Sequence, residues 1–372
     1  MVWVLLIFGF WQFGPPMPTP RYGFGVGVVG EKIYVIGGRN DTKILDMIEA
    51  YNTITSSWES IPVKLPTPRC YMGCATYEGK IYIIGGMTTL SGHNTSLVER
   101  FDPATNLWDT VAPLPRAKSG LVACTYANKI YAVGGYIRDS VGYYTKTVER
   151  YDPVLNSWRE VDSLNTPRIN AGVTVYNGKI YALGGSYYNS LKSVEYYVPN
   201  QWWNAQPMPR ARTGFGALSY GDCIYAIAGD DDGTLLNSVD IWLAESLWCK
   251  GPPLNHPRAY FGIAAVGDTI YVIGGKGTSG AINSLEYHSL PLPGITEPES
   301  PGCPSSPSFS TIVRNGSMIS VEDAEIEVYN SIGMLVKKGR NSIRIDFPKG
   351  VYFIRIKQNL NPPIIRKMIV IK

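Results

Sequence analysis

The feature that most constrains this chain of 372 residues is a six-fold internal repeat. The pattern Ile-Tyr-x-x-Gly-Gly recurs with its first small residue at intervals of 44 to 50 residues. Ala228 holds the first small position of the fifth copy, and the glycines of the six doublets are Gly37, Gly38, Gly85, Gly86, Gly134, Gly135, Gly184, Gly185, Gly229, Gly274 and Gly275. Six copies in register indicate a chain of similar supersecondary units.

Three further landmarks recur in each unit. A base stands 16 residues before the first small residue: Arg21, Arg69, Lys118, Arg168, Arg212 and Arg258. After the doublet comes an acid with an aromatic residue close behind it: Glu49, Glu99, Glu149, Glu195, Asp240 and Glu286 are the acids. A tryptophan follows in five units: Trp58, Trp108, Trp158, Trp202 and Trp248.

Each unit is expected to form four short strands, because β-type runs such as Lys179–Leu183 alternate with Pro-rich and Gly-rich breaks. A single sheet of this kind cannot bury both of its faces. Six sheets arranged radially can bury them and leave only short edges, so the repeat predicts a six-bladed β-propeller. The doublet is expected at the end of the second strand, where a side chain would obstruct the neighbouring backbone. The tyrosines and tryptophans are expected to fill the space between blades.

These residues resemble the kelch repeat. The Gly-Gly doublet, the tyrosine three positions before it, the segment Glu149-Arg-Tyr-Asp-Pro153 and the spaced tryptophan are its landmarks. The resemblance covers roughly residues 11–290 and implies an all-β propeller that often uses the face of the doublet loops for ligands.

The sixth unit has no tryptophan after Tyr287, and the N-terminus supplies a replacement. Residues 11–21, from Trp11 to Arg21, align without gaps on residues 248–258. Residues 2–20 are therefore expected to provide the closing strand of the last blade, which removes two sheet edges at once. Val2–Phe10 is a run of nine apolar residues, too short to span a bilayer. It leads into the closing strand or belongs to a secretory signal, and both alternatives stay open.

Beyond the propeller, predicted for residues 1–290, lie a Pro/Ser-rich linker at residues 291–309 and a small β-sandwich at residues 310–372. The runs Val328–Val336, Lys349–Arg355 and Lys367–Lys372 resemble the C-terminal sorting domain of the bacterial type IX secretion system. The usual Pro-Asn-Pro entry motif of that family is absent. The resemblance implies a partner in the secretion machinery and a secreted or cell-surface location. The alternatives are a stalk-like adhesive role for this domain and, for the chain, a cytoplasmic location.

Charge and composition exclude several classes. Residues 310–372 carry 11 basic and 5 acidic residues, and the remaining 309 residues carry 23 and 25, so the propeller is not basic enough for nucleic-acid binding. Three scattered histidines do not suggest a metal site, and no cofactor motif occurs. The six cysteines lack a CxxC pair and are expected to be small buried hydrophobes. Asp230–Gly233 lacks the spacing of a calcium loop and is expected to be an exposed turn, with a metal site as the alternative.

Two candidate ligand sites follow from the repeat. In an antiparallel meander, the six bases Arg21, Arg69, Lys118, Arg168, Arg212 and Arg258 share one face with the doublet loops and are expected to ring the channel mouth. They bind an anionic ligand there, or each pairs structurally with a nearby acid such as Glu99 or Glu149. Tyr143, Tyr144, Tyr187 and Tyr188 follow two doublets, and they form an aromatic platform or pack partly inward.

The function expected is non-catalytic recognition of a protein or glycan by an exported, monomeric bacterial propeller. The alternative is a carbohydrate-active enzyme at the channel mouth, similar to kelch-fold sugar-acid epimerases, in which carboxylates and arginines transfer protons. Two carboxylates and an arginine in one dry pocket would favour the enzyme. A shallow polar face with exposed aromatic residues would favour binding.

Overall fold

The computed structural model describes residues 10–139, 141–221, 223–243, 247–289, 310–314, 318–330, 335–344, 350–357 and 364–371. All regular elements among them are β-strands, as the repeat predicts. No helix in these ranges is long and apolar enough to cross a membrane. One compact unit comprises residues 10–288, and the C-terminal strands belong to a second.

Six four-stranded antiparallel sheets make up the first unit, and we number them as blades one to six. Blade one contains β2(Gly25–Val29), β3(Lys32–Ile36), β4(Ile48–Asn52) and β5(Ser57–Ser60). Blade two contains β6(Gly73–Tyr77), β7(Lys80–Ile84), β8(Val98–Asp102) and β9(Leu107–Val111). Blade three contains β11(Val122–Tyr126), β12(Lys129–Val133), β15(Val148–Asp152) and β16(Ser157–Val161). Blade four contains β17(Gly172–Tyr176), β18(Lys179–Leu183), β21(Val194–Val198) and β22(Gln201–Ala205). Blade five contains β23(Gly216–Tyr220), β24(Cys223–Asp231), β25(Thr234–Leu243) and β26(Leu247–Gly251). Blade six contains β27(Gly262–Val266), β28(Thr269–Gly277), β29(Gly280–Ser289) and the N-terminal strand β1(Gln12–Gly14).

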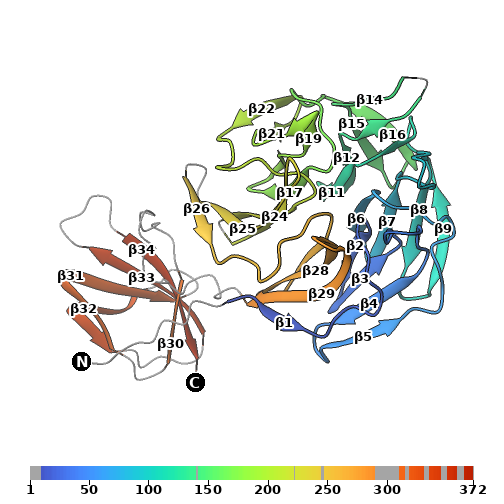
Figure 1. Cartoon of the computed structure of the whole chain (residues 1–372). Coiled ribbons are helices and arrows are strands. Elements are labelled where there is room, and N and C mark those ends of the chain that lie inside the picture. The colour runs from blue at the N-terminus through green and yellow to red at the C-terminus, as the bar shows by residue number, and fades with distance from the viewer. Residues whose placement is uncertain are drawn as a thin grey trace. The chain divides into compact units, whose positions relative to one another are not determined.

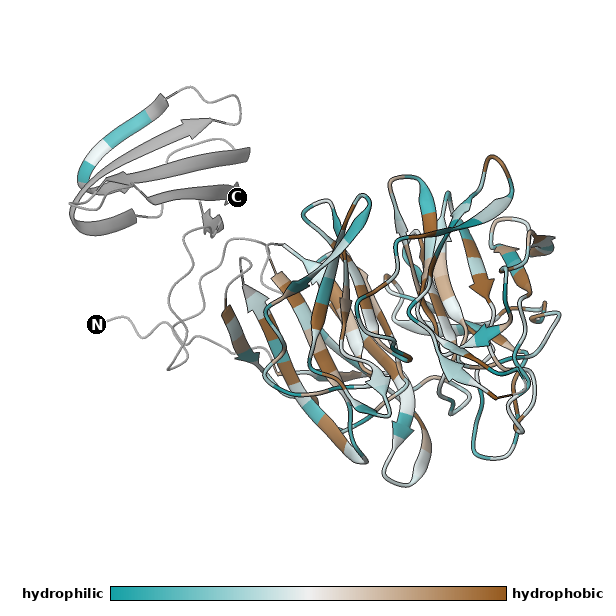
Figure 2. Ribbon diagram, turned by 90° about the horizontal axis from the view of Figure 1, so that it is seen from above, coloured by the Kyte–Doolittle hydropathy of each residue, from teal (hydrophilic) through white to brown (hydrophobic). Residues whose placement is uncertain are grey.

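The blades surround a common axis (Figure 1). The first strands β2, β6, β11, β17, β23 and β27 neighbour one another in that order, and β27 returns to β2. Apolar residues concentrate within the strands of this unit, and polar residues concentrate in its loops (Figure 2). The chain is therefore a closed six-bladed propeller, the architecture that the repeat predicts.

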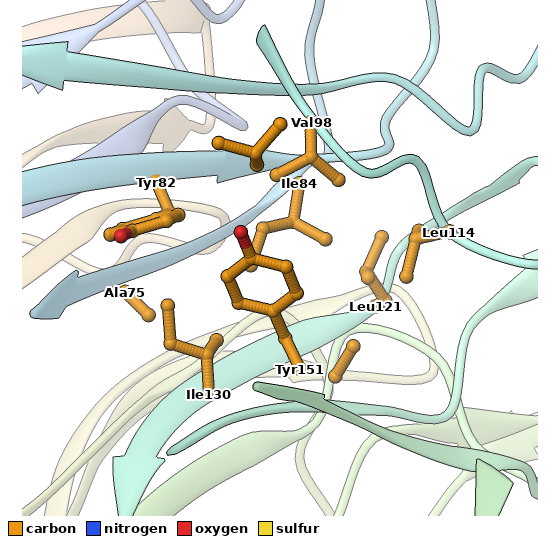
Figure 3. Packing of buried hydrophobic residues seen from close by; sticks show 10 residues of the cluster. Ala75, Tyr82, Ile84, Val98, Leu114, Leu121, Ile130 and Tyr151 are labelled. Carbon is orange, nitrogen blue, oxygen red and sulfur yellow. The ribbon is translucent and has the colours of Figure 1, made fainter. Parts of the chain in front are cut away.

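The core lies between neighbouring blades rather than in one central mass. Between blades two and three, for example, Ile84 and Val98 face Ile130 and Tyr151, all of them buried (Figure 3). The rings of Tyr82 and Tyr151 lie 6.0 Å apart between their centroids. These contacts explain why each unit needs both a tyrosine on its second strand and aromatic residues on its third and fourth strands.

The N-terminal strand β1 completes blade six, at the place that the alignment predicts. It pairs antiparallel with β29, with Phe13 opposite Glu286. Trp11 is 4% exposed, and its indole Nε1 donates to the Pro252 carbonyl at 2.9 Å. The indoles of Trp58, Trp158, Trp202 and Trp248 make the same kind of bond to a backbone carbonyl of the preceding blade's end. Trp11 is thus the tryptophan that blade six lacks after Tyr287.

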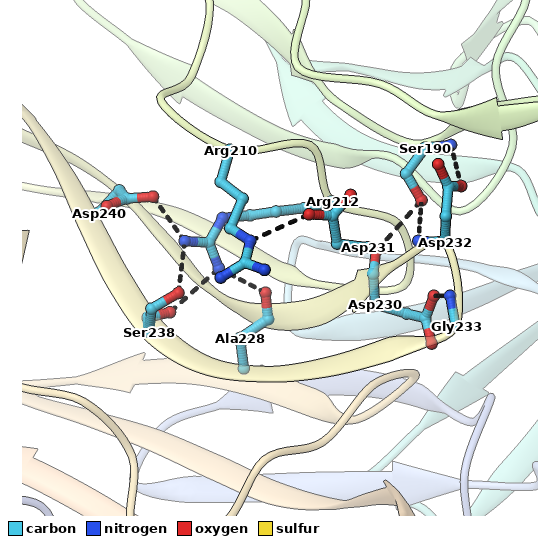
Figure 4. A network of polar contacts seen from close by, with 10 residues as sticks. All are labelled: Ser190, Arg210, Arg212, Ala228, Asp230, Asp231, Asp232, Gly233, Ser238 and Asp240. Carbon is cyan, nitrogen blue, oxygen red and sulfur yellow. Dashed lines mark hydrogen bonds and ion pairs between the residues drawn. The ribbon is translucent and has the colours of Figure 1, made fainter.

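Each blade holds one buried ion pair between the repeated base and the repeated acid. The pairs are Arg21–Glu49, Arg69–Glu99, Lys118–Glu149, Arg168–Glu195, Arg212–Asp240 and Arg258–Glu286. The bases are at most 1% exposed and the acids at most 4%. Arg212 also donates from Nη1 to the carbonyl oxygens of Ala228 at 2.6 Å and Ser238 at 3.0 Å (Figure 4). The base therefore ties the start of its blade to the end of the second strand and to the third.

The glycine doublet connects each blade to the next through the backbone of the same base. In every blade, the amide of the second doublet glycine donates to the backbone carbonyl of the base in the following blade. The Gly38 amide donates to the Arg69 carbonyl at 3.0 Å, and in the last blade the Gly275 amide donates to the Arg21 carbonyl at 2.9 Å. A methyl group on the first glycine would collide with that carbonyl, at 2.7 Å for Gly85 and 2.6 Å for Gly184. The expected obstruction of a neighbouring backbone is therefore present, and the obstructed backbone belongs to the next blade.

A second closed ring of hydrogen bonds runs around the axis. Each residue two positions after a base donates its amide to the carbonyl of its counterpart in the preceding blade, over distances of 2.6 to 2.8 Å. All six counterparts have positive φ, and glycines alternate with larger residues in the order Gly23, Tyr71, Gly120, Asn170, Gly214, Tyr260. A methyl group at Gly214 would lie 2.7 Å from the Tyr260 ring, and one at Gly23 would lie 3.1 Å from the Tyr71 ring. The larger side chains thus cover the glycines beside them.

The second unit contains five strands: β30(Ser310–Arg314), β31(Met318–Asn330), β32(Leu335–Arg344), β33(Gly350–Lys357) and β34(Ile364–Ile371). Their order is β30-β34-β33-β31-β32. Pairing is antiparallel, as the alternating pattern predicts, except that β30 pairs parallel with β34. The linker predicted at residues 291–309 lies outside the described residues.

The cysteines agree with the sequence expectation in part. Cys70 is fully buried, and burial raises the pKa of its thiol to about 12, so it behaves as a small hydrophobe. Cys249, however, is disulfide-bonded. Disulfides persist in oxidising compartments, which agrees with an exported chain.

Closure by β1 gives a first prediction. We expect Trp11→Ala to lower the free energy of unfolding by about 3–5 kcal/mol, because it removes a fully packed aromatic side chain from the last blade. Phe13→Ala on the same strand is the control, since Phe13 is 55% exposed and should cost about 1 kcal/mol or less. Urea unfolding of both variants measures the difference. Equal losses would contradict closure by this strand.

The buried pairs give a second prediction, tested by two arginines two positions apart. Arg212 is buried with Asp240, whereas the side chain of Arg210 is 50% exposed beside Asp231 (Figure 4). We expect Arg212→Ala to cost about 3–5 kcal/mol, because Asp240 is left buried without its partner. Arg210→Ala should cost below about 1 kcal/mol. Replacing Arg212 and Asp240 together by methionine and leucine should recover part of the loss. Similar melting temperatures for all three variants would refute a structural role.

His288 gives a third prediction, on pH. It is 8% exposed, its ring lies 5.4 Å from that of Trp11, and burial lowers its pKa. The unfolded chain then binds a proton more readily than the folded chain, so stability is full above about pH 6.5 and falls as the pH drops below it. Replacing His288 by glutamine should flatten this part of the profile of unfolding free energy against pH. The exposed His93→Gln should leave it unchanged, and an unaltered slope in the His288 variant would contradict the prediction.

Candidate aromatic recognition site

The loops that follow the glycine doublets lie on one face of the propeller, which we call the doublet-loop face. The second strand of every blade ends there and the third begins there, as with Ile36 and Ile48 in blade one. The connections from each fourth strand to the next blade end at the same edge. Longer and more varied loops gather here than at the opposite face, where tight turns join the strands.

The six bases expected at a channel mouth are not displayed on this face. Their side chains are buried and bonded to acids, as in the alternative in which each base pairs structurally. Burial lowers the pKa of the Lys118 amine, and the neighbouring Glu149 carboxylate opposes that shift. A ligand that approached these groups would have to displace a carboxylate from each of them.

Tyrosines that the repeat analysis did not single out line the axis at this face. The rings of Tyr71 and Tyr260 lie 5.6 Å apart edge to face, and Tyr22 lies 6.4 Å from Tyr71. Burial raises the pKa of all three hydroxyls. Arg39 lies 5.3 Å from the centroid of the Tyr22 ring. The signal for this lining is an aromatic residue one or two positions after the base in blades one, two and six.

Three of the four predicted platform tyrosines come together in one place, between blades three and four. Tyr144 lies 5.6 Å from Tyr187 and 5.3 Å from Tyr188, and the rings of Tyr187 and Tyr188 lie 4.7 Å apart. Tyr188 is 75% exposed, and Tyr143 and Tyr187 are each 38% exposed. Tyr144 is half-buried, which fits the expectation of one inward ring for the first pair, whereas both rings of the second pair are exposed.

Two residues that the sequence did not point to complete this cluster. Tyr136 on β13(Tyr136–Ile137) faces Tyr144 on β14(Tyr143–Tyr144), with ring centroids 5.4 Å apart. Arg116 donates from Nη1 to the Tyr143 hydroxyl at 2.6 Å. We call Arg116, Tyr136, Tyr143, Tyr144, Tyr187 and Tyr188 the tyrosine cluster. Tyr136 follows its doublet directly, which is the signal that would have identified it.

The loops that carry the cluster are tied to their neighbours. Asn94 donates from Nδ2 to the Tyr136 carbonyl at 2.8 Å. On the other side, the backbone amide of Ser190, on β20(Asn189–Ser190), donates to Asp232 Oδ1 at 2.7 Å (Figure 4). Tyr188, at the turn between β19(Ser186–Tyr187) and β20, has a φ of 63°. A bulky residue rarely adopts this conformation, and such strain often marks functional positions.

The acidic turn Asp230–Gly233 uses its carboxylates within the protein. Asp230 Oδ1 accepts from the Gly233 amide at 2.7 Å, Asp231 pairs with Arg210, and Asp232 accepts from Ser190 (Figure 4). Among the residues that the structure describes, no three His, Cys, Asp or Glu side chains are grouped as metal ligands. The turn thus anchors the loop of Tyr187 and Tyr188.

Comparisons with known proteins identify both units. Residues 11–185 match the KLHDC2/KLHL20/DRC7 Kelch-repeats domain, and residues 167–209 and 211–255 match the Kelch motif. Residues 307–372 match the Secretion system C-terminal sorting domain. That domain indicates export by the type IX system to the cell surface or the extracellular space.

Relatives among curated proteins match over short stretches only. Kelch-like protein 40 of Xenopus tropicalis is 26% identical over 128 residues, which are 34% of this chain and 20% of that protein. An F-box/kelch-repeat protein of Arabidopsis thaliana is 44% identical over 55 residues, 15% of this chain and 14% of that protein. The chain therefore spans a fifth or less of their lengths.

A solved structure, described as the structure of YjhT, superimposes with a TM-score of 0.63 at 16% identity and covers 73% of this chain and 95% of that one. At this identity the likeness concerns the fold alone. Together with the six buried pairs, the doublets and the closing strand, these matches show that the chain belongs to the kelch-repeat propellers and carries a C-terminal secretion sorting domain.

Proposed function

We propose that this exported propeller recognises a partner, without catalysis, through the tyrosine cluster on its doublet-loop face. The observation that carries the proposal is the exposed pair Tyr187 and Tyr188, whose rings contact each other and, across the blade boundary, the ring of Tyr144. Exposed aromatic residues with a polar tip contribute strongly to binding, because they bury a large apolar area and still form hydrogen bonds.

The rigidity of this surface supports recognition. On one side Asn94 donates to the Tyr136 carbonyl, and on the other the backbone amide of Ser190, two residues after Tyr188, donates to Asp232. Loops already fixed in the free protein lose little conformational entropy when a partner binds, so more of the contact energy appears as affinity.

The repeated carboxylates favour this proposal over the enzyme alternative, the sugar-acid epimerase. That chemistry needs an acid or base within reach of the substrate. Glu49, Glu99, Glu149, Glu195, Asp240 and Glu286 are at most 4% exposed, and each is bonded to its base. Buried and bonded in this way, these carboxylates are out of reach of a substrate on the surface.

A binding experiment with two double variants tests the proposal. We expect Tyr187→Ser with Tyr188→Ser to abolish the signals that the full chain gives on arrays of peptides and glycans, with little change in melting temperature because both rings are exposed. Val154→Ser with Leu155→Ser is the matched control. These apolar residues are 84% and 72% exposed at the turn between β15 and β16, on the opposite face. Unchanged signals in the tyrosine variant, or equal losses in the control, would disprove the proposal.

A further inference from the structure

We infer that the tyrosine cluster binds an acidic polysaccharide, one whose sugars carry carboxylates. The inference rests on the proposed function and specifies the chemistry of its ligand. It follows from two exposed lysines in the blades that carry the tyrosine pairs, at a repeat position that holds no cation in the other four blades.

The first observation concerns the repeat position three residues before the paired acid. Its backbone carbonyl accepts a hydrogen bond from the residue that begins the next connection, for example Lys146 from Leu164 at 3.0 Å and Lys192 from Met208 at 2.8 Å. The same bond identifies the equivalent residues of the six blades as Asp46, Ser96, Lys146, Lys192, Asn237 and Asn283. The backbone geometry therefore does not require a cation here.

The two lysines at this position belong to the two blades that carry the tyrosine pairs. Lys146 follows Tyr144 by two residues, Lys192 follows Tyr188 by four, and both lysine side chains are exposed. Arg116, also exposed, adds a third cation whose guanidinium contacts the Tyr143 hydroxyl. Positive charge thus accompanies the aromatic surface, and the most complementary ligand is an anion with apolar faces.

The second observation is the composition of this surface, which favours a glycan over a protein partner. Lysine is depleted in protein–protein interfaces, because the centres of these interfaces are apolar and contain few charged residues. Here exposed lysines lie close in sequence to the rings of Tyr144 and Tyr188. A pyranose presents C–H faces that stack on a tyrosine ring and hydroxyls that bond to the phenol, which matches the two-sided character of this side chain. A carboxylate on the sugar would then lie near a lysine or Arg116.

The anionic ligand expected at the channel mouth is therefore assigned to different residues. The buried ring of bases is neutralised within the fold. Arg116, Lys146 and Lys192 are exposed instead, Arg116 in contact with the Tyr143 hydroxyl and the lysines in the two blades that carry the tyrosine pairs. Charges in solvent attract an anionic chain over roughly a Debye length, about 8 Å at physiological salt.

The experiment uses the full chain and two matched probes: oligogalacturonate, and the same oligomer with its carboxylates methyl-esterified. We expect oligogalacturonate to bind at least about tenfold more tightly than the ester by calorimetry. Its affinity should fall as sodium chloride rises from about 0.01 to about 0.15 M. Alginate, a second uronate of different geometry, should compete with it.

Two variants that remove the same charge complete the design. Lys146→Gln with Lys192→Gln should weaken oligogalacturonate binding by about tenfold or more. Lys43→Gln with Lys276→Gln should change it by less than about twofold, since these exposed lysines lie on the same face of blades one and six, away from the tyrosines. Both variants should melt like the parent chain.

The outcomes separate the inference from the proposed function. Equal affinity for acid and ester, or equal effects of the two lysine variants, overturns the acidic ligand while recognition by the tyrosines stands. Binding of polyglutamate but neither uronate shows that the anion is a polypeptide and likewise overturns it. Binding of oligogalacturonate that survives Tyr187→Ser with Tyr188→Ser overturns both. Failure of the chain to bind either uronate overturns the inference alone.

Discussion

The buried pair of base and acid is the interaction on which the rest of this propeller depends. In blade five, Arg212 holds Asp240, the carbonyl of Ala228 on the second strand β24 and the carbonyl of Ser238 on the third strand β25. Its own carbonyl, like that of every repeated base, accepts the amide of a glycine in the preceding blade. A charge taken out of water is tolerated only when it is fully paired. The pair therefore fixes both the geometry within a blade and its attachment to the neighbouring blade.

These bonds occupy the polar groups of the repeated base, acid and glycine. Recognition is therefore left to the loops, which differ between blades. The segments after the doublets differ in length and composition, and they lie together at one face of the disc. Blades three and four place tyrosines and lysines there, whereas blade five places the acidic turn that ties down the loop of Tyr188. This division between a repeated frame and varied loops is typical of folds whose function resides in surface loops.

The sequence predicts the frame well because periodicity reports on it directly. The doublets, the tryptophans and the closing strand at Trp11 all follow from one residue pattern repeated in register. Whether the six bases are buried could not be decided from the sequence. Their burial depends on whether an acid on the third strand, such as Glu49 or Glu286, reaches the base that precedes the first strand. Tyr143, Tyr144, Tyr187 and Tyr188 could be named as candidates, but Arg116 approaches Tyr143 from another connection. The parallel pairing of β30 with β34 joins strands at opposite ends of the unit, and local alternation carries no such information.

The ring of amide hydrogen bonds around the axis restricts the number of blades that the propeller can contain. Around the circle, a residue with a side chain always follows a glycine, and each large side chain occupies the space over the glycine beside it. Such an alternation closes on itself only if the number of blades is even. A gain or loss of one repeat would bring two side chains or two glycines together at the seam. Repeats in this lineage should therefore be gained and lost in pairs, unless a substitution at the axis restores the parity.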